Sequence, residues 1–174
     1  REIRVQPQGA NTGLVGASNP DITGEQLVIS FERMSHDIVV NTTNRSVEVG
    51  AGVTLSQLNE TLYEYGFFFP IDLGADPQIG GMIATNTGGT RLLRYGSVRN
   101  HVLGLEVVLP DGQVWCDLSE LRKDNRGLDT KHAFIGTGGT YGLIARATLS
   151  VAPLNRQTKT AWASVEDAEG ALSL

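Results

Sequence analysis

Hydrophobic and polar residues alternate along several short stretches of the chain, and this pattern predicts a fold rich in strands. Residues 2–6 and 27–30 each have the alternation that is typical of a strand. Residues 36–50 contain two β-branched runs around Asn-Thr-Thr-Asn, and residues 101–118 contain two apolar runs around Asp-Gly. Both are predicted to be β-hairpins. Residues 142–153 alternate as a further strand that ends at a proline.

The clearest helical pattern covers residues 54–66. Thr54 is a good N-cap and Gln57 follows three residues later, as in a capping box, while Gly66 is placed to end the helix. Four residues share the predicted apolar face: Leu55, Leu58, Leu62 and Tyr65.

Shorter helices are predicted at residues 79–86 and 126–136, and residues from Asn155 onward are weakly patterned. Strands outnumber helices, and hairpins outnumber strand–helix–strand crossovers. The predicted fold class is therefore α+β, with a largely antiparallel sheet and flanking helices.

The charge of the chain argues against general binding to nucleic acid. The net charge is −5, and no run of lysine and arginine forms a basic patch. Arg91, Arg94 and Arg99 lie in the densest basic stretch, which is interpreted as the solvated end of a helix.

The cysteine, histidine and hydropathy patterns predict a protein that has no internal disulfide bond and no metal site. The single Cys116 is interpreted as a half-buried strand residue rather than a nucleophile. His36, His101 and His132 lack ligand spacing and are interpreted as surface or structural residues. No signal peptide or membrane-spanning run is visible, which predicts a cytoplasmic protein; peripheral membrane association of a longer protein is left open.

Two familiar nucleotide motifs are excluded. A P-loop needs Gly-Lys-Ser/Thr after a glycine-rich turn, and the chain has no such sequence. Gly50 and Gly52 lie between a strand and a helix, as in a dinucleotide fingerprint, but the third position is Leu55 and the hairpin pattern is wrong for a βαβ unit. This segment is interpreted as a capped turn.

The strongest chemical signal is glycine: the chain has 21 glycines, and 12 of them lie in three clusters. The clusters occupy residues 7–16, 73–89 and 134–144. Glycine allows close approach of a ligand to the main chain, and successive N–H groups form an anion-binding concavity. The three clusters together favour one shared ligand that carries phosphate.

These segments resemble the FAD-binding domain of the p-cresol methylhydroxylase and vanillyl-alcohol oxidase type. The likeness extends to about Pro153 and is greatest to FAD-linked D-2-hydroxyacid dehydrogenases, the group that acts on D-lactate, glycolate and D-2-hydroxyglutarate. It rests on PQGANTGLVG, VEVGAGVTLSQLNETL, the stretch from FPIDLGADPQIGG to VVLPDG, and KDNRGLDTKHAFIGTGGTYGLI.

The resemblance implies an FAD-binding fold of two subdomains, with the N-terminal part of the smaller one missing. It implies an FAD-binding domain at 1–153, and a linker or the start of a substrate domain at 154–174. The first glycine segment would bind the pyrophosphate, the second the pyrophosphate and flavin, and the third would close on the cofactor. The implied cofactor-binding residues are Pro7, Gln8, Gly9, Ala10, Asn11, Thr12, Gly13, Asp72, Leu73, Gly74, Gln78, Gly80, Gly81, Thr85, Asn86, Thr87, Gly88, Gly138, Gly139, Thr140, Gly142, Leu143 and Ile144.

The chain departs from the family pattern at three sites. Ala10 stands in place of a second glycine, and Gly138 in place of a common glutamate; KDNRGLD also differs around Arg126 and Leu128. Asn11 occupies the position where relatives with covalent flavin often have histidine. The resemblance therefore implies non-covalent FAD.

The function that the resemblance implies is oxidation of a small 2-hydroxy acid by hydride transfer to FAD. The catalytic groups are expected in a further C-terminal domain, so the chain by itself is expected to be inactive, and the electron acceptor is not indicated. Two alternatives remain: an oxidase or dehydrogenase of the same fold that acts on another alcohol or a phenol, and a non-catalytic module that has lost tight FAD binding.

Overall fold

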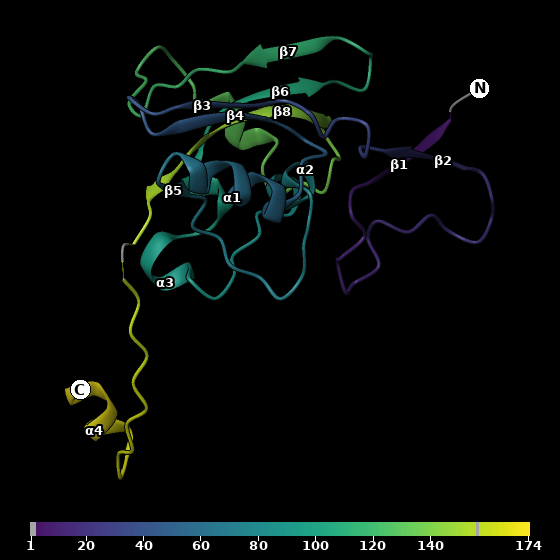
Figure 1. The fold of residues 1–174 in the computed structure, drawn as a ribbon. Helices are drawn as coiled ribbons and strands as arrows, with labels where there is room; N and C mark the ends of the chain where they lie inside the picture. The colour runs from purple at the N-terminus through teal and green to yellow at the C-terminus, as the bar shows by residue number, and fades with distance from the viewer. Residues whose placement is uncertain (1–2, 156) are drawn as a thin grey trace.

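The computed structural model describes residues 3–155 and 157–174, and its centre is a five-stranded sheet (Figure 1). Every neighbouring pair of strands in this sheet is antiparallel. This confirms the predicted fold class and both predicted hairpins. In spatial order the strands are β3 (Ile38–Asn41), β4 (Ser46–Gly50), β8 (Leu143–Ser150), β6 (Val102–Val108) and β7 (Val114–Asp117).

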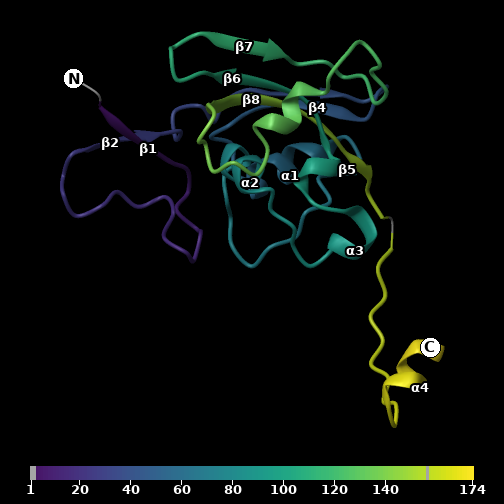
Figure 2. The ribbon, with the colours of Figure 1, turned by 180° about the vertical axis from the view of Figure 1, so that it is seen from behind.

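Two helices, α1 (Leu55–Glu64) and α2 (Ile79–Thr85), lie on the same side of this sheet in Figures 1 and 2. The core lies between them and the central strands. Val47 and Leu149 of the sheet are completely buried, as is Leu58 of α1. Burial of such side chains is the main favourable term in folding, at about 1.5–3 kcal/mol for each.

Helix α1 forms as the sequence predicts. The Thr54 hydroxyl accepts from the Gln57 N–H, and the Gln57 side chain accepts from the Thr54 N–H, which completes the capping box. The inclusion of Tyr65 in the buried face is wrong, because Tyr65 is the C-cap and is 50% exposed. The chain turns away at Gly66, where φ is 76°.

Short elements complete the main body. The predicted helix at 126–136 shortens to a single 3₁₀ turn, because Gly127 has φ of 130° and cannot begin a helix. The short elements are β5 (Phe67–Phe68), α3 (Leu92–Tyr95), η1 (Val98–Asn100), η2 (Thr130–Ala133) and β9 (Ala152–Pro153).

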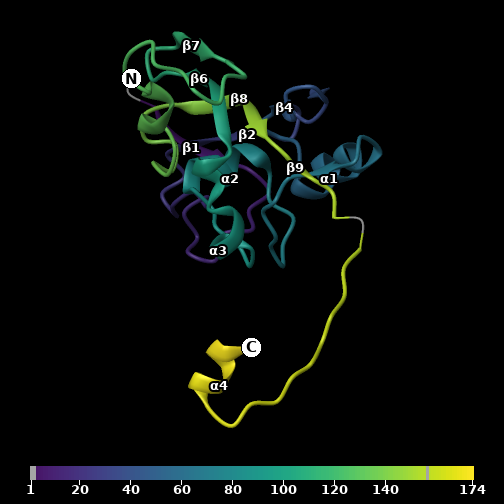
Figure 3. The same cartoon turned by 90° about the vertical axis from the view of Figure 1, so that its left-hand side faces the viewer.

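The C-terminal segment leads away from the main body, as Figure 3 shows. It ends in α4 (Ala168–Ser173), which the weak pattern after Asn155 did not predict. Asp167 caps this helix by accepting from the Gly170 N–H, and none of the helix residues is buried.

A second, two-stranded sheet lies beside the main body in Figures 1 and 2. It pairs β1 (Arg4–Gln8) with β2 (Gln26–Ser30) in parallel. The predicted first strand, 2–6, begins at Glu2, which lies outside the described residues. The observed strand continues through Pro7 and Gln8, so these two residues belong to a strand rather than to the glycine loop that follows.

Three further observations concern the cysteine, membrane and metal interpretations of the sequence. Cys116 is exposed on edge strand β7, so the prediction that it is half-buried is wrong. Within 3–155 and 157–174, no helix is both long and apolar enough to cross a membrane. The same residues contain no group of three His, Cys, Asp or Glu side chains that could hold a metal.

His101 is a structural histidine, and this leads to a prediction. Its Nε2 donates to the Tyr95 carbonyl at 2.8 Å, its Nδ1 accepts from the Ser150 hydroxyl at 3.3 Å, and its ring packs edge-on against Phe69. Burial lowers the pKa of His101 below its ordinary value near 6.5; the positive charge of Arg122 acts in the same direction, and the Tyr95 hydrogen bond opposes it.

Because the folded-state pKa is the lower one, the unfolded chain binds a proton first on acidification. The stability that neutral His101 contributes is therefore fully present above the ordinary pKa of histidine and is lost as the pH falls below that value. We expect the melting temperature to fall between about pH 7.5 and about pH 5.5, and to fall less steeply in His101→Gln. Exposed His36 supplies the control variant, His36→Gln. Equal slopes for wild type and His101→Gln would contradict the prediction.

Candidate functional site

Two adjoining hollows lie where the three glycine segments meet. The smaller, of about 120 Å³, is bounded by β1, α2 and the start of β8. The larger, of about 490 Å³, lies between the loop after β1 and the start of the second glycine segment. The two share Gly9, Ala17, Ser18, Gln78, Gly81 and Thr85, so they form one continuous site. The larger volume is within the range of sites for small molecules, about 300–1,000 Å³.

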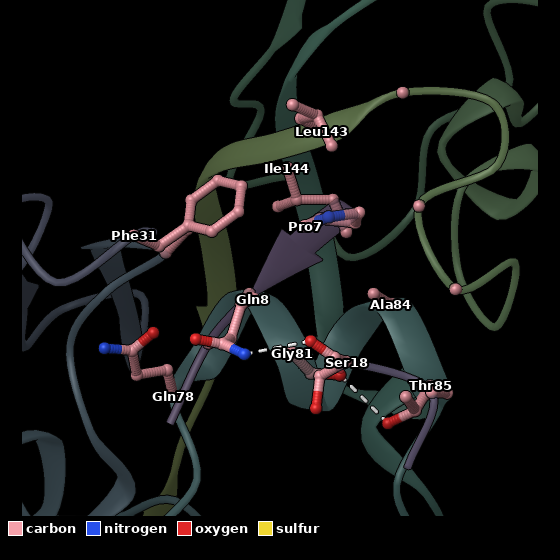
Figure 4. A pocket seen from close by; sticks show the side chains of 17 residues that line it. Pro7, Gln8, Ser18, Phe31, Gln78, Gly81, Ala84, Thr85, Leu143 and Ile144 are labelled. Atoms are coloured by element: carbon pink, nitrogen blue, oxygen red, sulfur yellow. Dashed lines mark hydrogen bonds between the residues drawn. The ribbon is translucent and has the colours of Figure 1, made fainter. Parts of the chain in front are cut away.

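The smaller hollow has an apolar side and a polar side (Figure 4). The Phe31 ring and the side chains of Leu143 and Ile144 lie on one side, and the amides of Gln8 and Gln78 lie on the other. Such a site accommodates a flat or elongated group with one apolar and one polar part.

The loop after β1, residues 9–25, is held by side chains of the strand before it. Gln6 Nε2 donates to the Ala17 carbonyl at 2.8 Å, and Gln8 Nε2 donates to the Ser18 carbonyl at 2.9 Å. The Ser18 hydroxyl in turn donates to Asn11 Oδ1 at 2.6 Å. These bonds fold the glycine-rich segment back over the larger hollow.

Main-chain N–H groups of this loop remain available to a ligand. Among the described residues, none of the N–H groups from Gly9 to Gly13 donates to a protein acceptor. Asn11 has φ of 55°, a left-handed conformation that turns the chain at this point. Consecutive free N–H groups around such a turn form a concave binding site for an anion.

The third glycine segment is attached to the C-terminal end of α2. The N–H groups of Gly136 and Gly138 donate to the carbonyls of Ile83 and Ala84, at 3.1 and 2.8 Å. Gly138 and Gly139 have φ of 65° and 88°, which favours glycine, and both line the smaller hollow. A glutamate at position 138 would have to adopt this left-handed conformation or change the turn.

Gln78 carries the clearest unmet polar group of the site. Its side chain is only 5% exposed, and its Oε1 has no hydrogen-bond partner in the described protein. Gln78 lines both hollows. A buried acceptor without a donor costs about 1–3 kcal/mol, so a ligand N–H or O–H at this position would remove that cost.

The site contains no ionisable side chain. No Asp, Glu, Lys, Arg, His, Cys or Tyr side chain is among the described residues that line either hollow. An anion would therefore be bound by main-chain N–H groups and neutral side chains, and these surfaces offer no general acid, general base or nucleophile.

Most of the residues implied by the resemblance are brought together here, and four are not. Asp72 accepts from the Thr90 hydroxyl and pairs with Arg91, outside both hollows. Asn86 caps α2, Gly88 packs against Leu92, and the Thr140 hydroxyl donates to the Thr137 carbonyl. These four shape the surrounding loops rather than line the site.

Ten further residues line the hollows. Six of them lie within the first two glycine segments: Leu14, Val15, Ala75, Pro77, Met82 and Ala84. Four lie outside the glycine segments: Ala17, Ser18, Phe31 and Ala51. Ser18 belongs to the same loop as the first glycine cluster, so the polar stretch after Gly16 was a usable signal. Phe31 had no signal in the sequence, because only the β1–β2 pairing brings its ring to the site.

Comparison with known proteins identifies the family. The sequence model of the family described as "FAD binding domain" matches residues 1–117. The chain belongs to this family. FAD is therefore its cofactor, and the anion-binding character of the site agrees with a cofactor that contains a pyrophosphate.

Curated relatives of this FAD-binding domain are longer proteins. It is 44% identical over 155 residues to the mitochondrial D-2-hydroxyglutarate dehydrogenase of Bos taurus. The aligned region covers 88% of this chain and 28% of the relative. It is 36% identical over 169 residues to the D-2-hydroxyglutarate–pyruvate transhydrogenase of Saccharomyces cerevisiae. This alignment covers 96% of this chain and 34% of the relative. The chain thus spans about a third or less of these proteins.

A solved structure shows the same fold. An alkyldihydroxyacetonephosphate synthase superposes with a TM-score of 0.77 at 23% identity, over 88% of this chain and 28% of that one. At this identity the likeness establishes the fold alone.

Proposed function

We propose that this chain binds FAD non-covalently for a longer flavin-dependent dehydrogenase that oxidises a small D-2-hydroxy acid. The observation that carries the proposal is the two-part hollow, in which free main-chain N–H groups lie beside an apolar wall. The names of the relatives support D-2-hydroxyglutarate as the first substrate to test.

The residues fit the cofactor. The N–H groups from Gly9 to Gly13 would bind the pyrophosphate, and Gln78 Oε1 would accept from a donor of the cofactor. Phe31, Leu143 and Ile144 would contact a ring and exclude water. When bound, the flavin would supply the hydride-accepting chemistry, and the protein would supply orientation and electrostatics.

Proton transfer requires groups outside these hollows. The described lining residues include no base that could take the hydroxyl proton and no cation that could orient a carboxylate. We therefore place both tasks on a different part of the full-length enzyme, and expect no turnover of D-2-hydroxyglutarate by this chain alone. Such positioning and proton transfer account for many orders of magnitude in rate.

The domain boundary is part of the proposal. We assign residues 1–153 to the FAD-binding domain, and residues 154–174 to a connecting segment. The assignment is supported by strand β9, which ends at Pro153, and by Trp162, which is 99% exposed in the segment that follows. The cytoplasmic location stays a prediction, since the bovine relative is named as mitochondrial; fractionation of cells that express the full-length protein tests it.

Spectroscopy of the purified chain tests the proposed function. We expect a yellow protein, or one that binds added FAD saturably, and complete release of the flavin into the supernatant on acid precipitation. Release is expected because Asn11 is no nucleophile and Cys116 lines neither hollow. A colourless protein that ignores added FAD would overturn the proposal, and flavin fluorescence that stays with the precipitate would overturn its non-covalent part.

A further inference from the structure

A short 3₁₀ turn, η1, connects two walls of the FAD site without lining either hollow. On one side it is bonded to the second glycine segment. The Val98 N–H donates to the Thr87 carbonyl at 3.0 Å, and the Arg99 N–H donates to Asn86 Oδ1 at 3.1 Å. Asn86 is the left-handed C-cap of α2, with φ of 50°. The main chain of Arg99 is therefore attached to the end of the helix that carries the second segment.

On the other side, the guanidinium of Arg99 is bonded to the start of the third glycine segment and to His132 just before it. Nη2 donates to the carbonyl of buried Ile135, and Nη1 donates to the carbonyl of His132 at 3.2 Å. Nη1 also lies 3.2 Å from His132 Nδ1. Because arginine only donates, this ring nitrogen accepts, and His132 Nε2 then carries the proton that faces Asp129 at 3.3 Å.

These bonds determine where the third segment lies. Gly136 directly follows Ile135, and the N–H groups of Gly136 and Gly138 donate to α2 carbonyls. Gly138 and Gly139 form one wall of the smaller hollow. A Cβ at Gly136 would lie 3.3 Å from Arg99 Nη2, so the guanidinium packs directly beneath the turn. One residue thus bonds to both segments that enclose the cofactor site.

We propose that Arg99 is a positioning residue for the FAD site, which holds the second and third glycine segments at the separation that the cofactor requires. This inference rests on the proposed function. It replaces the interpretation of this arginine as the solvated end of a helix. A lysine cannot take the role in full, because its ammonium is a compact charge, whereas the planar guanidinium donates to several separated acceptors at once.

The test compares FAD dissociation constants of Arg99→Ala, Arg99→Lys and a control, Arg94→Ala. The Arg94 guanidinium lies over the Tyr95 ring, 5.0 Å from its centre, and Arg94 lines neither hollow. We expect Arg99→Ala to raise the dissociation constant about tenfold, which corresponds to loss of one charged hydrogen bond, and Arg99→Lys to lie between it and wild type. Arg94→Ala is expected to bind FAD as wild type does.

Two further readouts separate positioning from general stability. In the FAD-free protein, amide exchange of residues 136–142 is expected to quicken in Arg99→Ala while exchange in α1 stays unchanged. The visible circular dichroism of bound FAD is expected to change shape. A lower melting temperature with unchanged FAD affinity and unchanged circular dichroism would overturn the inference.

The outcome is distinguishable from failure of the proposed function. If wild type binds no FAD, the proposed function fails and the exchange measurement alone decides whether Arg99 holds the third segment. If wild type binds FAD and all three variants bind it equally, the proposed function stands and the role of Arg99 is refuted.

Discussion

Gln78→Met is expected to stabilise the FAD-free protein and, at the same time, to weaken FAD binding at least about tenfold. The Gln78 side chain is buried, its Oε1 has no partner, and it makes no side-chain cap to α2. Methionine has a similar unbranched shape and removes the unpaired acceptor, which costs about 1–3 kcal/mol. The melting temperature should rise by about 2–12 °C. Thermal melts of FAD-free protein and FAD titrations measure the two effects.

Gln8→Met provides the matched control for this prediction. Gln8 lies on the same polar side of the smaller hollow, but its Nε2 donates to the Ser18 carbonyl. Its replacement removes a satisfied bond, so the melting temperature should fall rather than rise. A fall in melting temperature for Gln78→Met with unchanged FAD affinity would show that Gln78 stabilises the fold and does not bind the cofactor.

Gly52→Val is expected to lower the melting temperature by about 6–12 °C, equivalent to about 3 kcal/mol. A Cβ at this position would lie 1.9 Å from the Phe31 carbonyl oxygen and 3.0 Å from the carbonyl carbon of Met34. Both atoms belong to the main chain, so the segment after β2 must move as a whole. Because that segment carries the Phe31 ring, FAD affinity should fall as well.

Gly13→Val should weaken FAD binding without the loss of stability expected for Gly52→Val. Nothing lies within 4 Å of a Cβ at Gly13, yet the residue lines the larger hollow. We expect the melting temperature of the FAD-free protein to be almost unchanged and the FAD dissociation constant to rise. If both glycine variants lose stability and affinity in parallel, the loop after β1 has no specific role in binding.

Local chemistry was sufficient to predict much of this protein. The capping box at Thr54, the left-handed stop at Gly66 and the hairpin turn at Gly112 depend only on neighbouring residues, and all three form as expected. The clustering of glycines also indicated a phosphate-binding site, because free N–H groups and tight turns are properties of short segments. The family resemblance then identified FAD.

Only the tertiary structure decided which residues face the site. The sequence of the second glycine segment does not reveal that Asn86 caps α2 and binds η1 instead of lining a hollow. It also does not reveal that Asp72 pairs with Arg91. The sequence alone predicted that Tyr65 is buried and that Cys116 is half-buried. Both are exposed, because Tyr65 lies at the end of a helix and Cys116 lies on an edge strand. Exposure depends on which neighbours pack nearby, and those neighbours are distant in sequence.

Phe31 and Arg99 illustrate the same limit for function. Phe31 reaches the site through the parallel pairing of β1 with β2, and Arg99 acts across 36 residues on the Ile135 carbonyl. Neither residue belongs to a glycine cluster or a periodic pattern. Sequence patterns therefore determined the elements and the class of ligand, whereas long-range packing determined which side chains meet around it.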